Sequence, residues 1–185
     1  KAIIKLIEID YDAIPILKKK FPDIEIIHAD FLNFELNSIN WQKYSVLGNF
    51  PYNISSQILF KILENRDSVI ELVGMFQKEF ADRICSKPKS KKYGIPSVLL
   101  QAFFDCEHLF DVGPLNFFPK PKVDSSVIRL TRNNISNLGC DYLKFVETVK
   151  ISFSQRRKKI KNSLKKISKF NNLNLDQNLI SKRAE

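Results

Sequence analysis

With 185 residues, 44% of them apolar and 27% charged, the chain has the composition of a soluble globular protein with one well-buried domain and a smaller appendage. No apolar run reaches the roughly 18 residues of a membrane span and the N-terminus carries acidic residues, so we predict a cytoplasmic protein with no membrane segment or signal peptide. The net charge of +10 is concentrated in residues 141–185, which hold 12 Lys and Arg against 4 Asp and Glu and suit phosphate backbones or anionic membrane surfaces.

The first third of the chain alternates strand-like and helix-like segments. Runs rich in β-branched residues predict strands, and apolar residues three and four apart predict helices. The expected strands are residues 3–9, 24–28 and 44–47, and the expected helices are residues 13–21 and 54–63. Asp10 or Asp12 is expected to cap the first helix. This order predicts an α/β fold with a mostly parallel sheet and helices on both faces.

Three of the expected strands are followed by a polar side chain. These are Glu8, Asp30 and Asn49. Ligands of parallel sheets bind beyond the carboxyl ends of the strands, so we expect the three side chains to share one pocket.

The remaining two thirds of the chain contain further apolar runs and then a polar boundary. The expected strands are residues 69–76, 97–104 and 127–130, and the segment 77–84 follows the first of them. After the polar stretch 131–139, apolar residues recur at helical spacing at Phe145, Val149, Phe153, Ile160, Leu164 and Ile167, and Ser154 is a candidate cap for the second of these helices. We therefore expect an α/β domain at 1–132 and a small all-helical domain at 133–185.

The stretch Asn49-Phe50-Pro51-Tyr52 is the strongest candidate for chemistry. Adenine N6 is a poor nucleophile, and two acceptors that take its hydrogens help to direct its lone pair at an electrophilic methyl group. The Asn49 side-chain oxygen and the Phe50 carbonyl, whose direction Pro51 helps to fix, are two such acceptors. Tyr52 adds a flat face on which an extruded base can stack. The same tetrapeptide also suits an ordinary strand-to-helix turn.

The longer motif resembles the Asn-Leu-Pro-Tyr-Asn-Ile-Ser motif of the ribosomal RNA adenine N6,N6-dimethyltransferases, which act on small-subunit RNA. Further segments follow that family's order and spacing over nearly the whole chain. These segments are Gln77-Lys78-Glu79, Lys91-Lys92-Tyr93-Gly94, Phe117 to Ser125, Phe153 to Lys158, and Asn162-Ser163-Leu164. The resemblance implies a Rossmann-like methyltransferase domain, S-adenosylmethionine as cofactor, and a monomer that modifies the RNA of the small ribosomal subunit without a metal.

The resemblance also implies roles for individual residues. Glu8 binds the ribose hydroxyls of the cofactor, Asp30 accepts from its adenine amine, Ile9 and Phe31 form apolar walls, and Asn49 lines both cofactor and target. Taken singly, Glu8 and Asp30 are equally ordinary strand-end acids.

The base pocket and the RNA surface follow from later motifs. Phe117 is the implied second aromatic wall opposite Tyr52, with Phe118 an equally good candidate on its chemistry. The implied RNA-binding residues are Lys122, Arg156, Arg157, Lys158 and Lys161. The basic loop 87–92 either touches RNA or is simply solvated.

Two departures from the family pattern stand out. Phe50 stands where the family has leucine, and its larger side chain could narrow the pocket. The family's first strand and Gly-rich cofactor loop should precede residue 1, and the five glycines here are too far apart to form such a loop. We therefore expect a fragment that by itself binds S-adenosylmethionine weakly and is inactive.

Three other functions remain open from the residues alone. A large-subunit rRNA adenine methyltransferase of the antibiotic-resistance type has a similar pocket, while DNA adenine methyltransferases tend to carry Asn/Asp-Pro-Pro-Tyr. A non-catalytic ribosome-assembly or transcription factor could keep the same fold and basic helices.

Metal or disulfide chemistry is not indicated, because Cys85, Cys106 and Cys140 are odd in number and lack neighbouring histidines, so we expect reduced structural thiols.

Overall fold

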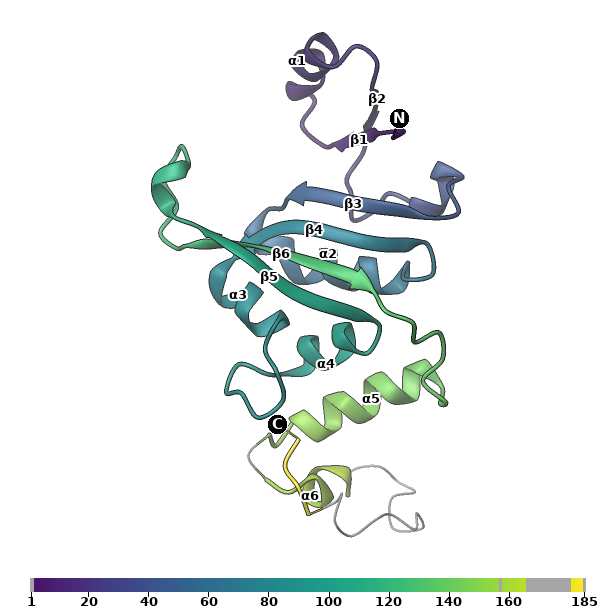
Figure 1. The fold of residues 1–185 in the computed structure, drawn as a ribbon, viewed down its shortest axis with the longest axis vertical. Coiled ribbons are helices and arrows are strands. Elements are labelled where there is room, and N and C mark those ends of the chain that lie inside the picture. The colour runs from purple at the N-terminus through teal and green to yellow at the C-terminus, as the bar shows by residue number, and fades with distance from the viewer. Residues whose placement is uncertain (1, 157, 166–180, 185) are drawn as a thin grey trace.

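The computed structural model describes residues 2–156, 158–165 and 181–184 (Figure 1). The strands are β1 (Lys5–Glu8), β2 (Glu25–His28), β3 (Tyr44–Asn49), β4 (Val69–Gln77), β5 (Phe104–Val112) and β6 (Ser125–Arg132). The helices are α1 (Ala13–Lys20), α2 (Ser55–Glu64), α3 (Lys78–Ile84), α4 (Ile95–Gln101), α5 (Tyr142–Phe153) and α6 (Ile160–Leu164). Three short 3₁₀ turns are η1 (Leu36–Ile39), η2 (Tyr52–Ile54) and η3 (Pro114–Asn116).

The strands form two separate sheets. β1 and β2 pair in parallel as a two-stranded sheet that packs with α1, and the other four strands form a sheet in the order β3-β4-β6-β5. In the larger sheet β3 and β4 are parallel, but β6 is antiparallel to both β4 and β5. The prediction of a mostly parallel sheet is therefore wrong for this half, because a direct hairpin connects β5 to β6 and reverses the chain.

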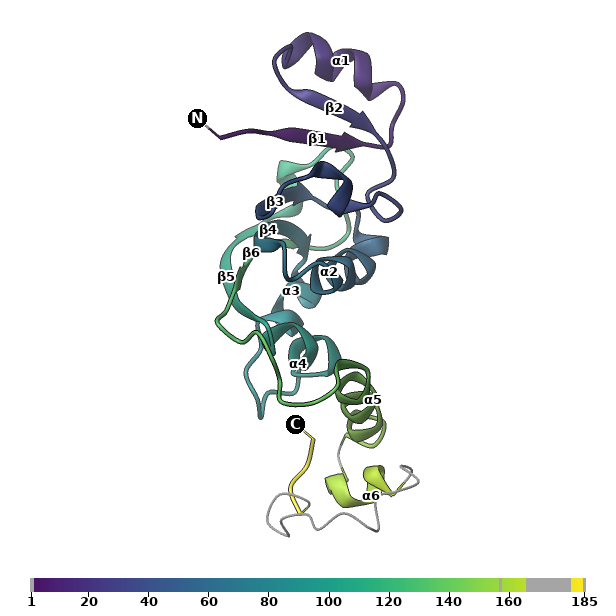
Figure 2. The same ribbon diagram turned by 90° about the vertical axis from the view of Figure 1, so that its right-hand side faces the viewer.

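The helices α2, α3 and α4 lie on one side of the four-stranded sheet (Figure 2). The burial of β4 alternates accordingly: Leu72 and Phe76 are fully buried, whereas Val73 and Met75 on the opposite face remain partly exposed. Helices on both faces of this sheet were expected, and in the part of the chain that the structure describes that expectation is wrong. The core lies between the sheet and these helices.

The segment 97–104, expected to be a strand, is mostly the helix α4. The Gly94 amide donates to the Ser97 side-chain oxygen at 3.0 Å, and Ser97 in turn donates to the Arg83 carbonyl at 2.6 Å. These bonds fix the first turn of the helix, and Leu99 and Leu100 are buried against the core. A short apolar run does not distinguish a strand from a buried helix, which explains the error. The actual strand, β5, begins at Phe104.

The helix α5 follows the polar connection 133–141 and packs against α4. Its first turn is capped by Asp141, whose carboxylate accepts from the Lys144 amide at 2.9 Å. Ser154 ends α5 rather than capping the next helix, since its hydroxyl donates to the Ile151 carbonyl at 2.7 Å, and Lys159 precedes α6. Ile167 lies outside the described residues. None of the helices described is long and apolar enough to cross a membrane.

Candidate active site

The turn between β3 and α2 is fixed by hydrogen bonds to two consecutive carbonyls. The buried Ser55 hydroxyl lies 3.0 Å from the Tyr52 carbonyl and 3.4 Å from the Pro51 carbonyl, which also accepts from the Ile54 amide at 3.3 Å. Asn49, the last residue of β3, is exposed, and its side-chain amide makes no hydrogen bond within the described residues. The turn therefore presents the side-chain amide of Asn49, without a hydrogen-bond partner among the described residues, next to a backbone that hydrogen bonds hold in place.

Phe50 anchors this turn to the core. Its ring stacks on Phe76, with centroids 5.4 Å apart and planes at 26°, and contacts Phe31 at 6.1 Å. The ring covers Gly48 and Gly74, which face each other across β3 and β4. A Cβ atom would lie 2.6 Å from the Phe50 ring at Gly48 and 2.8 Å from it at Gly74. Both glycines are thus required for the ring to lie here.

Tyr52 is bonded to a distant strand. Its hydroxyl lies 2.5 Å from the hydroxyl of Ser125, the first residue of β6. Because β4 lies between β3 and β6, this bond crosses the carboxyl end of β4. The Tyr52 side chain is consequently held along the edge of the sheet at which β3 and β4 end.

Contacts link the three strand ends at which polar residues were expected to meet. The Ala29 amide donates to the Glu8 carbonyl at 3.0 Å, which joins the ends of β1 and β2. Phe31, next to Asp30, contacts Phe50 in the turn after β3. The side chain of Ile9 is exposed beside these ends. The structure thus places the predicted residues along one continuous edge.

The carboxylates at this edge differ in how far they are already bonded. One Glu8 oxygen accepts from the Asp10 amide at 2.8 Å, and no hydrogen bond of the other is found among the described residues. Asp30 accepts from the Leu32 amide at 2.9 Å and from the Asn33 side chain at 2.7 Å. The expected caps of α1 do not bond the helix: Asp12 precedes α1 but its side chain makes no capping hydrogen bond, and the Asp10 carboxylate accepts from the Asp12 amide at 2.9 Å in the turn before the helix.

The connection from β5 to β6 carries the second expected aromatic residue. Phe117 is half-buried just after η3, whereas Phe118 is 102% exposed and Lys122 is also exposed. No aromatic contact joins the Phe117 and Tyr52 rings in the described part of the chain. Figure 1 shows this connection projecting beyond the end of the sheet to which the arrowhead of β3 points. The wall opposite Tyr52 remains a prediction.

A charged network borders the Tyr52–Ser125 pair. Asp111 accepts from the Ser126 hydroxyl at 2.6 Å, lies 2.8 Å from His108 Nε2, and forms an ion pair with Lys78. These hydrogen bonds, that of Lys78 first, hold the pKa of Asp111 well below its usual range, and the same bond raises the pKa of Lys78. Both groups therefore stay charged at neutral pH and are unsuited to proton transfer.

The two half-buried thiols are equally unsuited to nucleophilic chemistry. Burial raises the pKa of Cys85 to about 11 and that of Cys106 to about 12. The thiolate is the nucleophilic form, so both side chains are inert near neutral pH. All three cysteines are free, as expected, and no group of three His, Cys, Asp or Glu side chains suited to a metal lies within the described residues.

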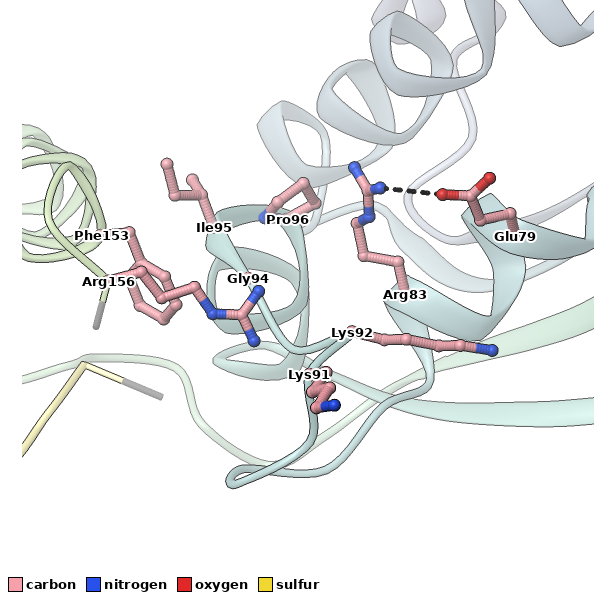
Figure 3. A pocket seen from close by; sticks show the side chains of 9 residues that line it. All are labelled: Glu79, Arg83, Lys91, Lys92, Gly94, Ile95, Pro96, Phe153 and Arg156. Carbon is pink, nitrogen blue, oxygen red and sulfur yellow. Dashed lines mark hydrogen bonds and ion pairs between the residues drawn. The ribbon is translucent and has the colours of Figure 1, made fainter.

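A second feature is a pocket of about 600 Å³ that we call the cationic pocket (Figure 3). It is lined by Glu79, Arg83, Lys91, Lys92, Gly94, Ile95, Pro96, Phe153 and Arg156. Four cations and one acid give it a positive balance, although Arg83 pairs with Glu79 at 3.5 Å and Lys92 with Asp82 at 2.6 Å. The pocket joins α3, the basic loop, α4 and the end of α5.

Two contacts connect the end of α5 and the residues just after it to the basic loop 87–92 and the adjoining Tyr93. Arg156 donates to the Ser90 carbonyl at 2.8 Å, and the Phe153 and Tyr93 rings lie 6.2 Å apart. Of the other residues expected to bind RNA, Lys158 and Lys161 are exposed and Arg157 lies outside the described residues. The structure thus brings Arg156 and the basic loop together, a contact that their separation of 66 residues concealed in the sequence.

Sequence reasoning assigned no role to Ser55, Ser125 or Arg83. Ser55 belongs to a quoted motif, and a serine just after a turn signals a side-chain bond to nearby backbone. Ser125 ends another of the quoted segments, but nothing local predicts its bond to Tyr52, because the two residues are 73 positions apart.

The sequence matches the family described as ribosomal RNA adenine dimethylase over residues 4–183. Among curated relatives, the "Ribosomal RNA small subunit methyltransferase A" of Cytophaga hutchinsonii is 49% identical over 98% of this chain and 70% of its own length. The protein of the same name from Bacteroides thetaiotaomicron is 48% identical over 89% of this chain. The chain spans 63% of the length of that second relative.

Solved structures agree on the fold. A dimethyladenosine transferase from Plasmodium falciparum superposes with a TM-score of 0.83 over 97% of this chain and 75% of its own, at 23% identity. The 23S rRNA methyltransferase ErmE gives a TM-score of 0.68 at 27% identity, over 88% of this chain and 66% of its own. The predicted α/β methyltransferase fold is confirmed, and so is the resemblance on which the enzyme class was predicted. The chain belongs to the ribosomal RNA adenine dimethylase family.

Proposed function

We propose that this protein transfers methyl groups from S-adenosylmethionine to N6 of adenosines in small-subunit ribosomal RNA, giving N6,N6-dimethyladenosine. The observation that carries the proposal is Asn49, whose unbonded amide ends β3 on a turn fixed by Ser55. Relatives named as small-subunit enzymes are 49% and 48% identical, against 27% for the solved 23S rRNA enzyme, which favours the small subunit over the large one.

The chemistry at the target nitrogen requires two acceptors and a stacking face. The Asn49 side-chain oxygen and the Phe50 carbonyl accept the two N6 hydrogens, which directs the nitrogen lone pair away from the ring. Pro51, with φ −59° and ψ 134°, stiffens the backbone between these acceptors and Tyr52. Tyr52 stacks on the extruded base, with Phe117 as its proposed counterpart across the ring.

The residues at the strand ends fit an adenosine-type cofactor. The Glu8 carboxylate keeps one oxygen available as an acceptor for a ribose diol, and Asp30 has acceptor capacity left for an adenine amine. Ile9 and Phe31 would provide apolar contacts beside them. S-adenosylmethionine, when bound, supplies a methyl group activated by its sulfonium, so neither a metal nor a base with a shifted pKa is required.

The cationic pocket is the proposed site for the RNA backbone. Lys91, Lys92 and Arg156 converge on it from two segments, and Lys122, Lys158 and Lys161 add exposed positive charge. In this assignment residues 1–132 perform the transfer and residues 133–185 dock the RNA. The substrate is the small-subunit particle, and the protein acts as a monomer in the cytoplasm, where that particle is assembled.

The test is Asn49→Ala in the full-length protein, assayed with methyl-labelled S-adenosylmethionine and unmethylated small subunits. Loss of one positioned hydrogen-bonding group at a reacting centre lowers turnover by about 100-fold or more. We expect labelled N6,N6-dimethyladenosine from the wild type, almost none from the variant, and RNA affinity within about twofold of wild type.

Asn37→Ala is the matched control, because Asn37 is also an exposed asparagine in a short turn but lies in η1, away from β3's carboxyl end. Full transfer by Asn49→Ala would remove the mechanism. Salt-sensitive binding to the subunit without any label from the wild type would instead favour a non-catalytic assembly factor.

A further inference from the structure

We infer that Ser125 is a positioning residue for methyl transfer, whose hydroxyl holds the Tyr52 ring in the orientation in which it stacks on the target adenine. This inference rests on the proposed function. It gives a task to a fully buried residue that acts through its bond to Tyr52.

The first argument is that the Tyr52 ring is fixed at both ends. At its backbone, the Tyr52 carbonyl accepts from the Ser55 hydroxyl at 3.0 Å. At its tip, the phenol oxygen lies 2.5 Å from the Ser125 hydroxyl oxygen. A tyrosine side chain has only two main torsions, and anchoring the backbone and the phenol oxygen fixes the direction of the long axis of the ring. The hydrogen-bonding directions of a phenol oxygen lie close to the ring plane, so the position of Ser125 also favours one rotation about that axis.

The second argument is that Ser125 itself cannot move. It is 0% exposed and lies in register with Gln77 of β4 on one side and with Val112 of β5 on the other. A buried residue paired on both sides is a rigid anchor. The half-buried Tyr52, in contrast, belongs to a short 3₁₀ turn, and its bond to Ser125 ties its side chain to the sheet.

The third argument concerns direction. Asn49 ends β3, and the bond from Tyr52 to Ser125 crosses the carboxyl end of β4, next to it in the sheet. The ring is therefore drawn across the same sheet edge at which the Asn49 amide is presented. Methyl transfer needs the base amine aligned with the donor, and small errors in such alignment are costly in rate.

If the Ser125 hydroxyl had only a structural role, the hydroxyl of its buried neighbour Ser126 should be equally important for methyl transfer. Ser126 is also 0% exposed, and its hydroxyl donates to Asp111 at 2.6 Å, within the network that includes Lys78 and His108. Ser126 thus provides a matched control: a buried serine hydroxyl on the same strand, bonded to a charged network rather than to Tyr52.

The test is a double-mutant cycle in the full-length protein with Ser125→Ala, Tyr52→Phe and the two combined. Tyr52→Phe keeps the stacking face and removes only the phenol hydroxyl. Each single variant should lower kcat about tenfold, as expected when a single orienting hydrogen bond is lost, with KM for both substrates within about twofold. The combined variant should again be about tenfold slower, not about a hundredfold, because both changes remove the same bond.

A second readout is independent of turnover. With 2-aminopurine in place of the target adenosine, stacking on Tyr52 quenches the fluorescence of the base, and Ser125→Ala should relieve part of that quenching. Ser126→Ala should combine multiplicatively with Tyr52→Phe in kcat and leave the quenching unchanged. Thermal unfolding of every variant separates folding defects from effects at the site.

Several results would overturn the inference. The inference fails if Ser125→Ala or Tyr52→Phe has the kcat of the wild type, or if the losses in the double variant multiply. It also fails if Ser126 is coupled to Tyr52 as strongly as Ser125 is. If Asn49→Ala abolishes transfer while Ser125→Ala is normal, only this inference fails. Absence of transfer by the wild type would instead remove the proposed function.

Discussion

Gly48 and Gly74 face each other across β3 and β4, and the ring of Phe50 occupies the space that their missing side chains leave. Phe50 can therefore place a large ring here because Gly48 and Gly74 have no side chains. The family's leucine at this position would fill less of that space. At the scale of single residues, the replacement of leucine by Phe50 adds a packed contact with Phe76, and the ring is directed onto the sheet.

This packing predicts the effect of Gly74→Ala. A Cβ atom there would lie 2.7 Å from the Phe76 ring and 2.8 Å from the Phe50 ring, so both rings must shift. Overpacking of this kind lowers the free energy of unfolding by about 2 kcal/mol. In a Phe50→Leu background the loss should be smaller, because one of the two clashes is reduced, and urea unfolding of the four chains measures the difference.

Gly113→Ala is the control for this cycle, since the nearest atom to a Cβ there is 4.0 Å away. It should leave the unfolding midpoint close to that of wild type. An equal cost of Gly74→Ala with phenylalanine or leucine at position 50 would show that the Phe50 ring is not what the glycine accommodates.

At the scale of elements, one arginine fixes the start of the connection that leads from the sheet to α5. Arg132, the last residue of β6, donates to the carbonyls of Arg66 at 3.1 Å, Phe103 at 2.9 Å, Asn133 at 2.9 Å and Ile135 at 2.8 Å. The connection 133–141 is thus held at its start rather than hanging free. The sequence predicts the boundary between the two domains at this same residue, and that boundary remains a prediction.

Arg132→Ala should lower the free energy of unfolding by about 2 kcal/mol, because several partly buried carbonyls lose a charged donor together. Protease sensitivity of the connection 133–141 should rise in parallel. Arg129→Ala is the matched control, as Arg129 lies on the same strand but pairs with Glu107 in solvent, and exposed pairs contribute little. Equal urea midpoints for the two variants would contradict the role given to Arg132.

The elements also show how far sequence reasoning reaches. The turn after β3 was predictable, because proline, asparagine and serine act on their immediate neighbours. The identity of α4 was not, since a short apolar run fits a strand or a buried helix and the choice is made by Gly94, Ser97 and the core. The antiparallel placement of β6 and the bond between Tyr52 and Ser125 depend on contacts far apart in the chain, which no local pattern encodes.

At the scale of the whole molecule, positive charge gathers at the end that carries α5 and the cationic pocket. If this end binds the RNA backbone, the affinity should fall linearly with the logarithm of salt concentration. Lys91→Ala with Lys92→Ala should reduce the slope by about one to two units and weaken all RNA sequences alike. Fluorescence anisotropy with a small-subunit RNA fragment over a salt series measures both effects.

The control for that series is Lys18→Ala with Lys19→Ala, which removes two exposed lysines from the end of α1. The salt dependence of RNA affinity in this control variant should have the same slope as in the wild type. Equal slopes for both double variants would mean that the pocket does not contribute to RNA binding beyond the general charge of the protein.

The division of the strands into two sheets has a consequence for the behaviour of the chain in concentrated solution. Among the described residues, β1 and β3 each pair on one side only, so each has a free row of backbone donors and acceptors. Leu47 on β3 is 82% exposed beside one of these edges. Open edges with apolar side chains are where separate chains add strands to one another. The edge of β3 should therefore limit the solubility of the chain, and Leu47→Lys should raise that solubility while leaving Asn49 unchanged.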